Sequence, residues 1–199
     1  MSFYRDQLED WLSGQHIKAD RVLDVGGRAK PVFTRVASWA VTDLYATMDN
    51  DLEPGDYATL SKQGANHWTD DINEPLSPDH PIFKVDKYDL VFCLEVMEYV
   101  WNPIQAIANI ASLMKTGAKL VITFAFVYPV HKPIESDFLR YTPQGATKLL
   151  AECGLKTESV FSRIDRSGKL LEFYKADGMH VGGNAHVTGV IIEARKVGD

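Results

Sequence analysis

Acidic residues stand where successive apolar segments of the sequence end. They are Asp24, Asp43, the pair Asp70 and Asp71, and Glu95. Acids are common in turns and helix caps, so each of them alone has an ordinary structural explanation. Successive segments that end in the same way instead favour a shared ligand, because parallel strands bring their carboxyl ends to one edge of a sheet. The pattern therefore predicts a polar binding site at that edge.

The first of these segments runs into Gly26 and Gly27 without forming a complete phosphate-binding loop. A dinucleotide loop goes on to a third glycine and opens a long helix, whereas residues 28–31 here read Arg-Ala-Lys-Pro. Asp43 lies 19 positions after Asp24 (43 − 24), which suits a carboxylate that accepts hydrogen bonds from a ribose diol. Asp24 would repel a pyrophosphate but attract an ammonium or sulfonium group. The pattern therefore predicts a nucleoside ligand with a positively charged tail.

Apolar periodicity predicts strands that alternate with helices. Strands are expected at residues 21–25, 39–44, 65–70, 88–94, 118–126, 156–161 and 188–195, and helices at 2–13, 103–114 and 143–153. This alternation is typical of an α/β fold, a doubly wound, Rossmann-like and mostly parallel sheet of about seven strands with helices on both faces. Residues 1–199 are expected to form a single domain. Its N-terminal helix (1–14) and the segment 163–187 are candidates for a substrate cap.

Composition narrows the class of protein. The formal net charge is −6, which argues against a protein that mainly grips nucleic acid phosphates. No apolar run approaches the roughly 18 residues of a membrane span, and the polar start MSFYRDQLEDW is not a signal peptide. The two cysteines, Cys93 and Cys153, lie in apolar patterns and are expected to be reduced. We therefore expect a cytoplasmic protein with neither a membrane nor a nucleic acid partner.

Four motifs occur in an order and spacing shared with a known family. They are VLDVGG (22–27), VTDLY (41–45), TDDI (69–72) and LEVMEYV (94–100). With the later segments LMKTGAKLVITF and DFLRYTPQGATKLLAECGL, they make the sequence resemble the class I S-adenosylmethionine-dependent methyltransferases over roughly residues 20–160. The resemblance is to the small single-domain, methyltransferase type 11-like branch. It implies S-adenosylmethionine as the cofactor, S-adenosylhomocysteine as its product and a small-molecule methyl acceptor.

The resemblance assigns the methionine part of the cofactor to two strand ends. Gly26 and Gly27 would let the backbone approach it, and Asp24 would support their loop or the ammonium group. The carbonyl of Leu94 would contact the same ammonium group, with Glu95 beside it.

The resemblance assigns the nucleoside part to the next two strand ends. Asp43 would hold both ribose hydroxyls, and Leu44 would pack on the adenine. Asp71 would bind the adenine amino group, with the adjacent Asp70 as the alternative. The backbone of Ile72 would read the adenine ring.

The sequence departs from the family pattern at two points. The third glycine of the loop is missing, and residues 28–38 leave room only for a short helix interrupted by Pro31. The histidine that usually follows the E-V-L-E motif is Tyr99 in this sequence.

Residues after the fourth and fifth strands are expected to face the methyl group. His131 is the first choice for a general base, because the unperturbed pKa of histidine lies near neutrality. A role as a loop residue or an orienting donor is the alternative for His131, and Tyr99 is the second catalytic candidate. Tyr128, Asp137 and Arg140 are assigned to acceptor binding. Arg140 would clamp a carboxylate or phosphate, or form a structural salt bridge.

No metal site is expected. Residues 49–56 (DNDLEPGD) space oxygen atoms somewhat like a calcium loop, but the glycine comes one place late and no helix pair flanks them. His180 and His186 lack carboxylate or thiolate neighbours at the usual spacing. A flexible glycine-bearing loop explains them better.

Two other functions stay open beside methyl transfer. A nicotinamide-linked oxidoreductase shares the acid after the second strand, but it needs the missing phosphate-binding glycine. A methyltransferase-like binding module without catalysis is suggested by the short first helix and by Tyr99.

Overall fold

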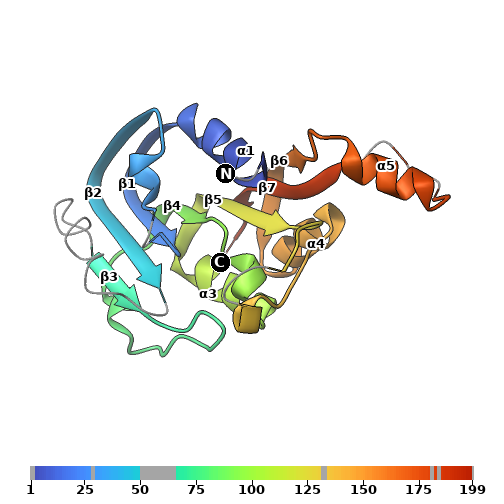
Figure 1. The fold of residues 1–199 in the computed structure, drawn as a ribbon. Helices are drawn as coiled ribbons and strands as arrows, with labels where there is room; N and C mark the ends of the chain where they lie inside the picture. Colours follow the sequence, from blue (N-terminus) through green and yellow to red (C-terminus); the bar gives the residue numbers. More distant parts are fainter. Residues whose placement is uncertain are drawn as a thin grey trace.

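The computed structural model of the protein describes residues 3–27, 30–49, 66–130, 134–179, 182 and 185–198. A seven-stranded sheet forms its centre, in the order β3-β2-β1-β4-β5-β7-β6 (Figure 1). The strands are β1 (His16–Val25), β2 (Ser38–Asp49), β3 (Asn66–Thr69), β4 (Tyr88–Cys93), β5 (Met114–Ala125), β6 (Leu155–Ile164) and β7 (Val187–Lys196). In this sheet, β7 runs in the opposite direction to the other six strands. The predicted doubly wound, mostly parallel sheet is confirmed.

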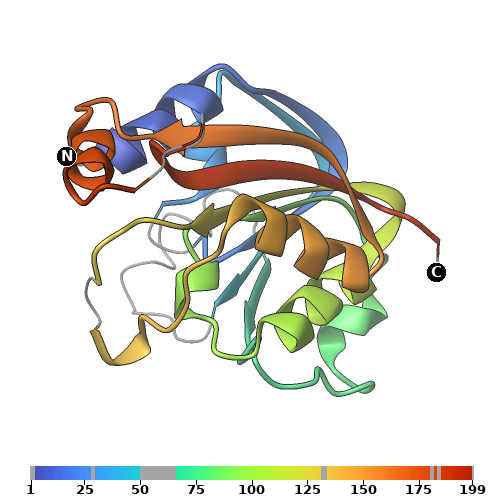
Figure 2. The same ribbon diagram turned by 90° about the vertical axis from the view of Figure 1, so that its right-hand side faces the viewer.

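Helices lie on both faces of the sheet. They are α1 (Phe3–Ser13), α3 (Pro103–Leu113), α4 (Pro143–Glu152) and α5 (Lys169–Ala176). Single 3₁₀ turns connect other elements: η1 (Val32–Thr34), η2 (Pro81–Lys84), η3 (Met97–Tyr99) and η4 (Ile134–Ser136). Helix α1 covers one face, and α3 and α4 cover the other (Figure 2). Helix α5 projects beyond the sheet and buries none of its residues (Figure 1).

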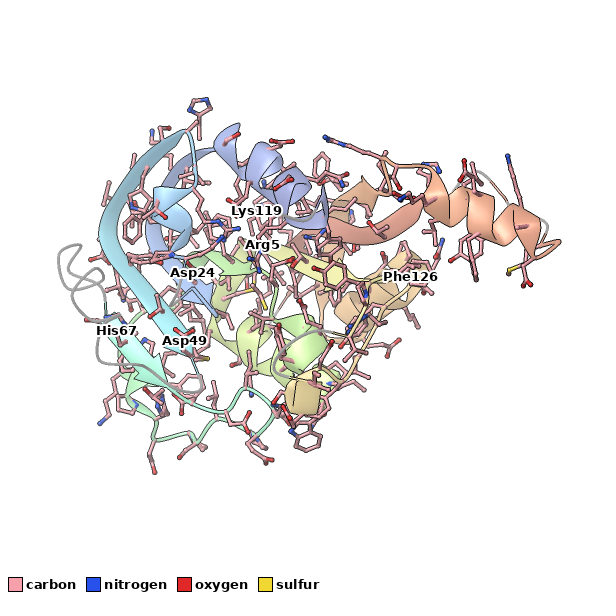
Figure 3. All side chains as sticks on the ribbon, viewed as in Figure 1. Arg5, Asp24, Asp49, His67, Lys119 and Phe126 are labelled. Carbon is pink, nitrogen blue, oxygen red and sulfur yellow. The ribbon has the colours of Figure 1, made fainter. Side chains whose placement is uncertain are left out.

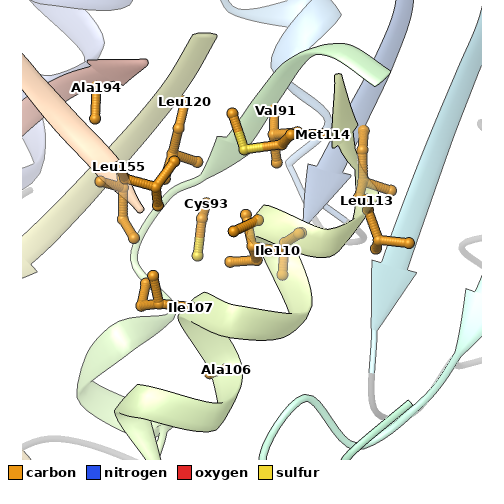
Figure 4. Close-up of a cluster of buried hydrophobic side chains, with 14 of the residues drawn as sticks. Val91, Cys93, Ala106, Ile107, Ile110, Leu113, Met114, Leu120, Leu155 and Ala194 are labelled. Carbon is orange, nitrogen blue, oxygen red and sulfur yellow. The ribbon is translucent and has the colours of Figure 1, made fainter. Parts of the chain in front are cut away.

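An apolar core fills the space on each side of the sheet. On one face, Ile107 and Ile110 of α3 pack in the cluster that contains Cys93 of β4 (Figure 4). On the other face, Leu8 of α1 belongs to the cluster that contains Phe92. Because β4 is covered on both sides, its near-continuous apolar sequence is the pattern expected for a central parallel strand.

The second strand is longer than the sequence predicts. It ends at Asp49, so the prediction that it ends at Asp43 is wrong. The register of β1 and β2 shifts between Ala19 and Arg21, where β2 carries one extra residue. The polar residues 42–43 lie at this bulge and are exposed. A bulge interrupts the alternation without ending the strand, which is why the polar pair resembles a strand end in the sequence.

The connection after β1 is a tight loop followed by the single turn η1. Gly26 has φ +75°, a left-handed conformation that glycine adopts without strain, and its N–H donates to the Met48 carbonyl at 2.9 Å. A Cβ atom on Gly27 would lie 2.2 Å from the Asp24 carboxylate, so no side chain fits there. The loop therefore requires glycine at both positions.

Asp24 anchors this loop from inside the protein. Its side chain is only 2% exposed, and Oδ2 accepts the Val32 N–H and the Tyr45 hydroxyl, each at 2.8 Å. Burial raises the pKa of Asp24 to about 6, and the two hydrogen bonds only partly offset that effect. Asp24 therefore contacts the segment that follows the glycine turn, and its role toward the cofactor stays a prediction.

The raised pKa of Asp24 predicts a pH-dependent stability. Because the folded-state pKa of about 6 lies above the ordinary 3.8, the contribution of Asp24 is fully present below the ordinary value and is lost as the pH rises through about 6. We expect the free energy of unfolding of the wild type, relative to that of Asp24→Asn, to fall by roughly 2–3 kcal/mol between pH 4 and pH 7.5. Urea titrations at a series of pH values measure this difference.

The matched control for this prediction is Asp20→Asn, because Asp20 lies on the same strand and is exposed. Its difference from the wild type should change little over the same pH range. A wild-type minus Asp24→Asn difference that stays constant with pH would contradict the buried, destabilised carboxylate.

Candidate active site

The carboxyl ends of β2, β1 and β4 lie side by side, because these three strands are neighbours and run parallel. Asp49 ends β2, the Gly26 turn follows β1, and Glu95 comes directly after Leu94 beyond β4. Figure 3 labels Asp49 at the tip of the β2 arrow. An acidic group, a glycine turn and a second acidic group therefore share one edge, as predicted, although the acid on β2 is a different residue.

Asp43 and Leu44 do not reach this edge. Both lie before the buried half of β2, and Asp43 forms an exposed ion pair with Arg21 at 2.7 Å. Leu44 pairs with Arg21 in the sheet and packs against the core on the α3 face. The assignment of Asp43 to the ribose and of Leu44 to the adenine is therefore corrected.

Asp49 takes the place at the edge that was assigned to Asp43. The sequence carries a signal for it, because three of the four residues before Asp49 are apolar: Tyr45, Ala46 and Met48. All four residues, 45–48, are buried in the structure. A strand that continues past the polar residues 42–43 would end at Asp49. The residue types at 42–43 do not by themselves indicate a bulge.

Glu95 adopts a strained backbone that the surrounding side chains hold in place. Its φ is +58°, which is uncommon for a residue with a side chain. Its N–H donates to Thr123 Oγ1 at 2.7 Å, and Thr123 Oγ1 donates back to Glu95 Oε1 at 3.0 Å. The following residue, Val96, closes on the glycine turn, since a Cβ atom on Gly26 would meet its Cγ2 at 2.3 Å. The turns after β1 and β4 are therefore packed against each other.

The end of β3 supplies two carboxylates in different surroundings. Asp70 pairs with His80 Nε2 at 3.0 Å, and burial raises its pKa. Asp71 is exposed, and its Oδ1 accepts the backbone and side-chain N–H groups of Asn73 at 2.9 and 2.8 Å. Ile72 is buried in the core. Asp71 is thus the more accessible of the two predicted adenine ligands.

Arg140 and Asp137 hold each other and are not open to an acceptor. The guanidinium donates to both carboxylate oxygens of Asp137, at 2.5 and 2.7 Å. It also donates to the carbonyls of Tyr128, Pro129 and Leu139. All five N–H groups of Arg140 are therefore used, and the Asp137 side chain is fully buried. The assignment of both residues to direct acceptor binding is corrected, because together they fix the shape of the loop after β5.

Of the two predicted catalytic residues, only Tyr99 lies in the part of the chain that the structure describes. His131 lies outside the described residues. Tyr99 lies on η3, and burial, reinforced by Glu98, raises its pKa to about 12. A phenol with such a pKa stays protonated near neutral pH, so Tyr99 is suited to donate a hydrogen bond rather than to act as a base.

Glu98 is a buried carboxyl group that the sequence does not single out. Its side chain is 3% exposed, and Oε2 has no hydrogen-bond partner within the described part of the chain. Burial and the nearby Glu95 raise its pKa to about 7. Its backbone carbonyl accepts the N–H groups of Phe138 and Leu139 at 2.8 and 3.2 Å. Glu98 therefore joins η3 to the loop after β5.

A cavity of about 180 Å³ opens between α1, the end of β5 and the start of α5. Its lining residues are Tyr4, Val127, Tyr128, Ile164, Asp165, Leu170 and Thr188. The rings of Tyr4 and Tyr128 lie 4.5 Å apart and form one wall. Of the predicted acceptor-binding residues, Tyr128 therefore lines a cavity, together with the predicted cap segments.

Within the described ranges, no three His, Cys, Asp or Glu side chains gather closely enough to hold a metal ion. The calcium-like segment 49–56, apart from Asp49, and His180 lie outside the described residues. No helix in the described part of the chain is both long and apolar enough to cross a membrane.

Solved structures share this fold at low sequence identity. The Burkholderia thailandensis 1,6-didemethyltoxoflavin-N1-methyltransferase, solved with 1,6-didemethyltoxoflavin and S-adenosylhomocysteine, has a TM-score of 0.62 and 13% identity over 98% of this chain and 77% of its own. The mitomycin 7-O-methyltransferase MmcR has a TM-score of 0.58 and 13% identity over 98% of this chain and 54% of its own. The [4+2]-cyclase SpnF has a TM-score of 0.63 and 16% identity over 97% of this chain and 82% of its own.

A search of curated proteins gave no match. The family model described as a methyltransferase domain matches residues 2–173, which is most of the chain. The protein belongs to the methyltransferase-domain family, with the fold of the class I S-adenosylmethionine-dependent enzymes.

Proposed function

We propose that the protein transfers a methyl group from S-adenosylmethionine to a small-molecule acceptor. The observation that carries this proposal is the meeting of the Gly26 turn, Asp49 and Glu95 at one edge of the sheet. Val96 and the Asp24 carboxylate fill the space that side chains on Gly26 and Gly27 would need, so the turn after β1 presents only backbone to a ligand. Carboxylates beside such a turn suit a ligand with a ribose at one end and a positive charge at the other.

In our proposal, each residue at this edge contacts a different part of the cofactor. Asp49 would accept hydrogen bonds from the ribose hydroxyls, and Asp71 from the adenine amino group. The Gly26 turn and the carbonyl of Leu94 would contact the methionine part, with Glu95 beside its ammonium group. When bound, S-adenosylmethionine supplies a methyl group on a positively charged sulfur, which needs no metal to activate it.

The acceptor would enter the cavity lined by Tyr4 and Tyr128. The protein lowers the barrier chiefly by alignment of the acceptor atom with the methyl carbon and the sulfur, an effect that can supply about 7–11 kcal/mol. For an acceptor that must lose a proton, His131 remains our prediction for the base. Glu98 is the second candidate, because burial and the nearby Glu95 raise the pKa of its carboxyl group toward neutrality.

Other properties support a small-molecule enzyme of a reducing compartment. The formal net charge of −6 disfavours a nucleic acid acceptor. Cys93 and Cys153 are both free thiols, as expected of the cytoplasmic protein that we propose.

A methyltransferase-like module that does not transfer methyl groups is the second candidate function. The helix after β1 is reduced to the turn η1, and Tyr99 replaces the expected histidine. One protein of the same fold is described as a cyclase. A nicotinamide-linked oxidoreductase is disfavoured, because the loop after β1 lacks the glycine that admits a pyrophosphate.

Calorimetry and a turnover assay test these functions. We expect S-adenosylmethionine and S-adenosylhomocysteine to bind and NAD not to bind. Release of S-adenosylhomocysteine in the presence of candidate small-molecule acceptors would establish methyl transfer. Binding of S-adenosylmethionine without release across a broad acceptor panel would favour the binding module, and binding of NAD alone would favour the oxidoreductase.

Asp49 and Asp43 provide a matched pair of variants for the cofactor site. Asp49→Ala should weaken S-adenosylhomocysteine binding by roughly 1.5–3 kcal/mol, the contribution of hydrogen bonds to a charged group. Asp43→Ala should bind with wild-type affinity, since Asp43 pairs with Arg21 away from the edge. Isothermal titration calorimetry measures both. The reverse result, with Asp43→Ala impaired and Asp49→Ala unaffected, would place the ribose elsewhere.

Filling the cavity separates acceptor binding from cofactor binding. Leu170→Trp should occupy much of the 180 Å³ cavity and lower kcat/KM for an identified acceptor by about tenfold or more. The affinity for S-adenosylhomocysteine should stay at the wild-type value. Lys169→Trp is the control, because the neighbouring Lys169 is exposed and does not line the cavity. Equal turnover in both variants would move the acceptor away from this cavity.

A further inference from the structure

Arg163 is a buried arginine near the end of the edge strand β6. Its side chain is 1% exposed, whereas its neighbours Phe161 and Ser162 on the same strand are exposed. A guanidinium group removed from water costs free energy unless other groups pair with it. The position of Arg163 therefore has to be explained by its partners.

Two groups from distant parts of the chain hold the guanidinium of Arg163. Its Nη1 donates to Glu95 Oε1 at 2.8 Å, and its Nη2 donates to the Tyr4 hydroxyl. Its Cζ atom also lies 3.4 Å from the centre of the Tyr4 ring, a cation–π contact. Within the described residues, Nε has no hydrogen-bond partner. Glu95 and Tyr4 are thus the groups that fix this side chain.

The first partner leads to the cofactor edge. Glu95 Oε1 is shared between Arg163 and Thr123, and these bonds hold the strained backbone of Glu95. The next residue, Val96, lies against Gly26. The charge of Arg163 therefore supports the turn that faces the glycine loop.

The second partner leads to the acceptor cavity. Tyr4 belongs to α1 and stacks against Tyr128, and both rings line the cavity. A Cβ atom on Gly189 would lie 2.8 Å from the Tyr4 ring, so the ring rests directly on the backbone of β7. The planar face of Arg163 therefore supports the wall made by the N-terminal helix.

We propose that Arg163 is a positioning residue for methyl transfer, which holds the Glu95 turn and the Tyr4 wall of the acceptor cavity in fixed relation. The assignment of the Glu95 turn to cofactor binding and of the Tyr4 wall to acceptor binding rests on the proposed function. Arginine meets both demands at once, because its fork pairs with a carboxylate while its plane stacks on an aromatic ring. Lysine has the charge but not the plane.

Two variants separate these two contributions. Arg163→Met removes both the charge and the plane, so binding of S-adenosylhomocysteine should weaken by about tenfold or more. Hydrogen exchange in residues 3–13 should also become faster, because α1 loses its support. Arg163→Lys should keep the affinity within about threefold of the wild type, since an ammonium still pairs with Glu95. Hydrogen exchange in residues 3–13 of Arg163→Lys should be as fast as in Arg163→Met, because lysine has no planar group to support Tyr4.

Arg195→Met is the matched control. Arg195 lies on β7, is paired with Glu158 at 2.6 Å and is half exposed, so the same substitution should change neither measurement. Calorimetry with S-adenosylhomocysteine and hydrogen exchange followed by mass spectrometry are made on the full chain. Thermal denaturation of each variant is recorded first, and both measurements are made at a temperature at which all variants are folded.

The outcomes are decisive in both directions. Wild-type affinity together with wild-type exchange in Arg163→Met would overturn the proposal, and so would faster exchange with unchanged affinity. If Arg163→Met does not fold, Arg163→Lys carries the test, because a general packing defect does not preserve affinity while it loosens α1. If the wild type fails to bind S-adenosylhomocysteine, the proposed function is contradicted, and the exchange of α1 in Arg163→Met against Arg195→Met still tests the positioning role.

Discussion

Parallel pairing of β1 with β2 and β4 is the constraint on which the candidate site depends. Because these strands run in the same direction, their carboxyl ends meet, and the residues after each of them become neighbours. Gly26 donates to the Met48 carbonyl of β2, and Val96 after β4 packs against Gly26. The turn after β1 is therefore shaped from both sides by the strands that flank it.

Buried charge is concentrated around this edge. Asp24, Glu98 and Arg163 are all buried, and Arg163 pairs with Glu95 at this edge. Each of these groups loses hydration, and burial raises the pKa of both carboxyl groups. Such groups are costly in a core that serves only stability, and two of them pair both with a core tyrosine and with a turn: Asp24 with Tyr45 and the Val32 N–H, and Arg163 with Tyr4 and Glu95.

The two halves of the edge are built in different ways. Around the Gly26 turn, backbone conformation dominates, through the glycine itself and the strained Glu95. Around the loop after β5, side chains dominate, through the Arg140–Asp137 pair and the contact between Tyr4 and Tyr128. A surface made of side chains can change its specificity with fewer changes in the fold than one made of backbone.

Local sequence determined the fold class, the glycine turn and most of the strand ends. Apolar periodicity is set by which face of an element is buried, so alternating strands and helices could be predicted without coordinates. The structure confirmed the doubly wound sheet.

Only the tertiary structure decided which acid of β2 reaches the edge and which charged groups are engaged. The bulge at residues 42–43 depends on the pairing of β2 with β1, which no local pattern encodes. Because the strand continues through the bulge, it ends at Asp49 and not at Asp43. The sequence favours Arg140 as an anion clamp, because a residue type does not indicate its hydrogen-bond partners. In the structure, all five N–H groups of its guanidinium donate to groups of the loop after β5. Arg163 meets Tyr4 across 159 positions and Glu95 across 68. Contacts between residues so far apart in sequence arise only when the chain folds, because packing rather than spacing brings them together.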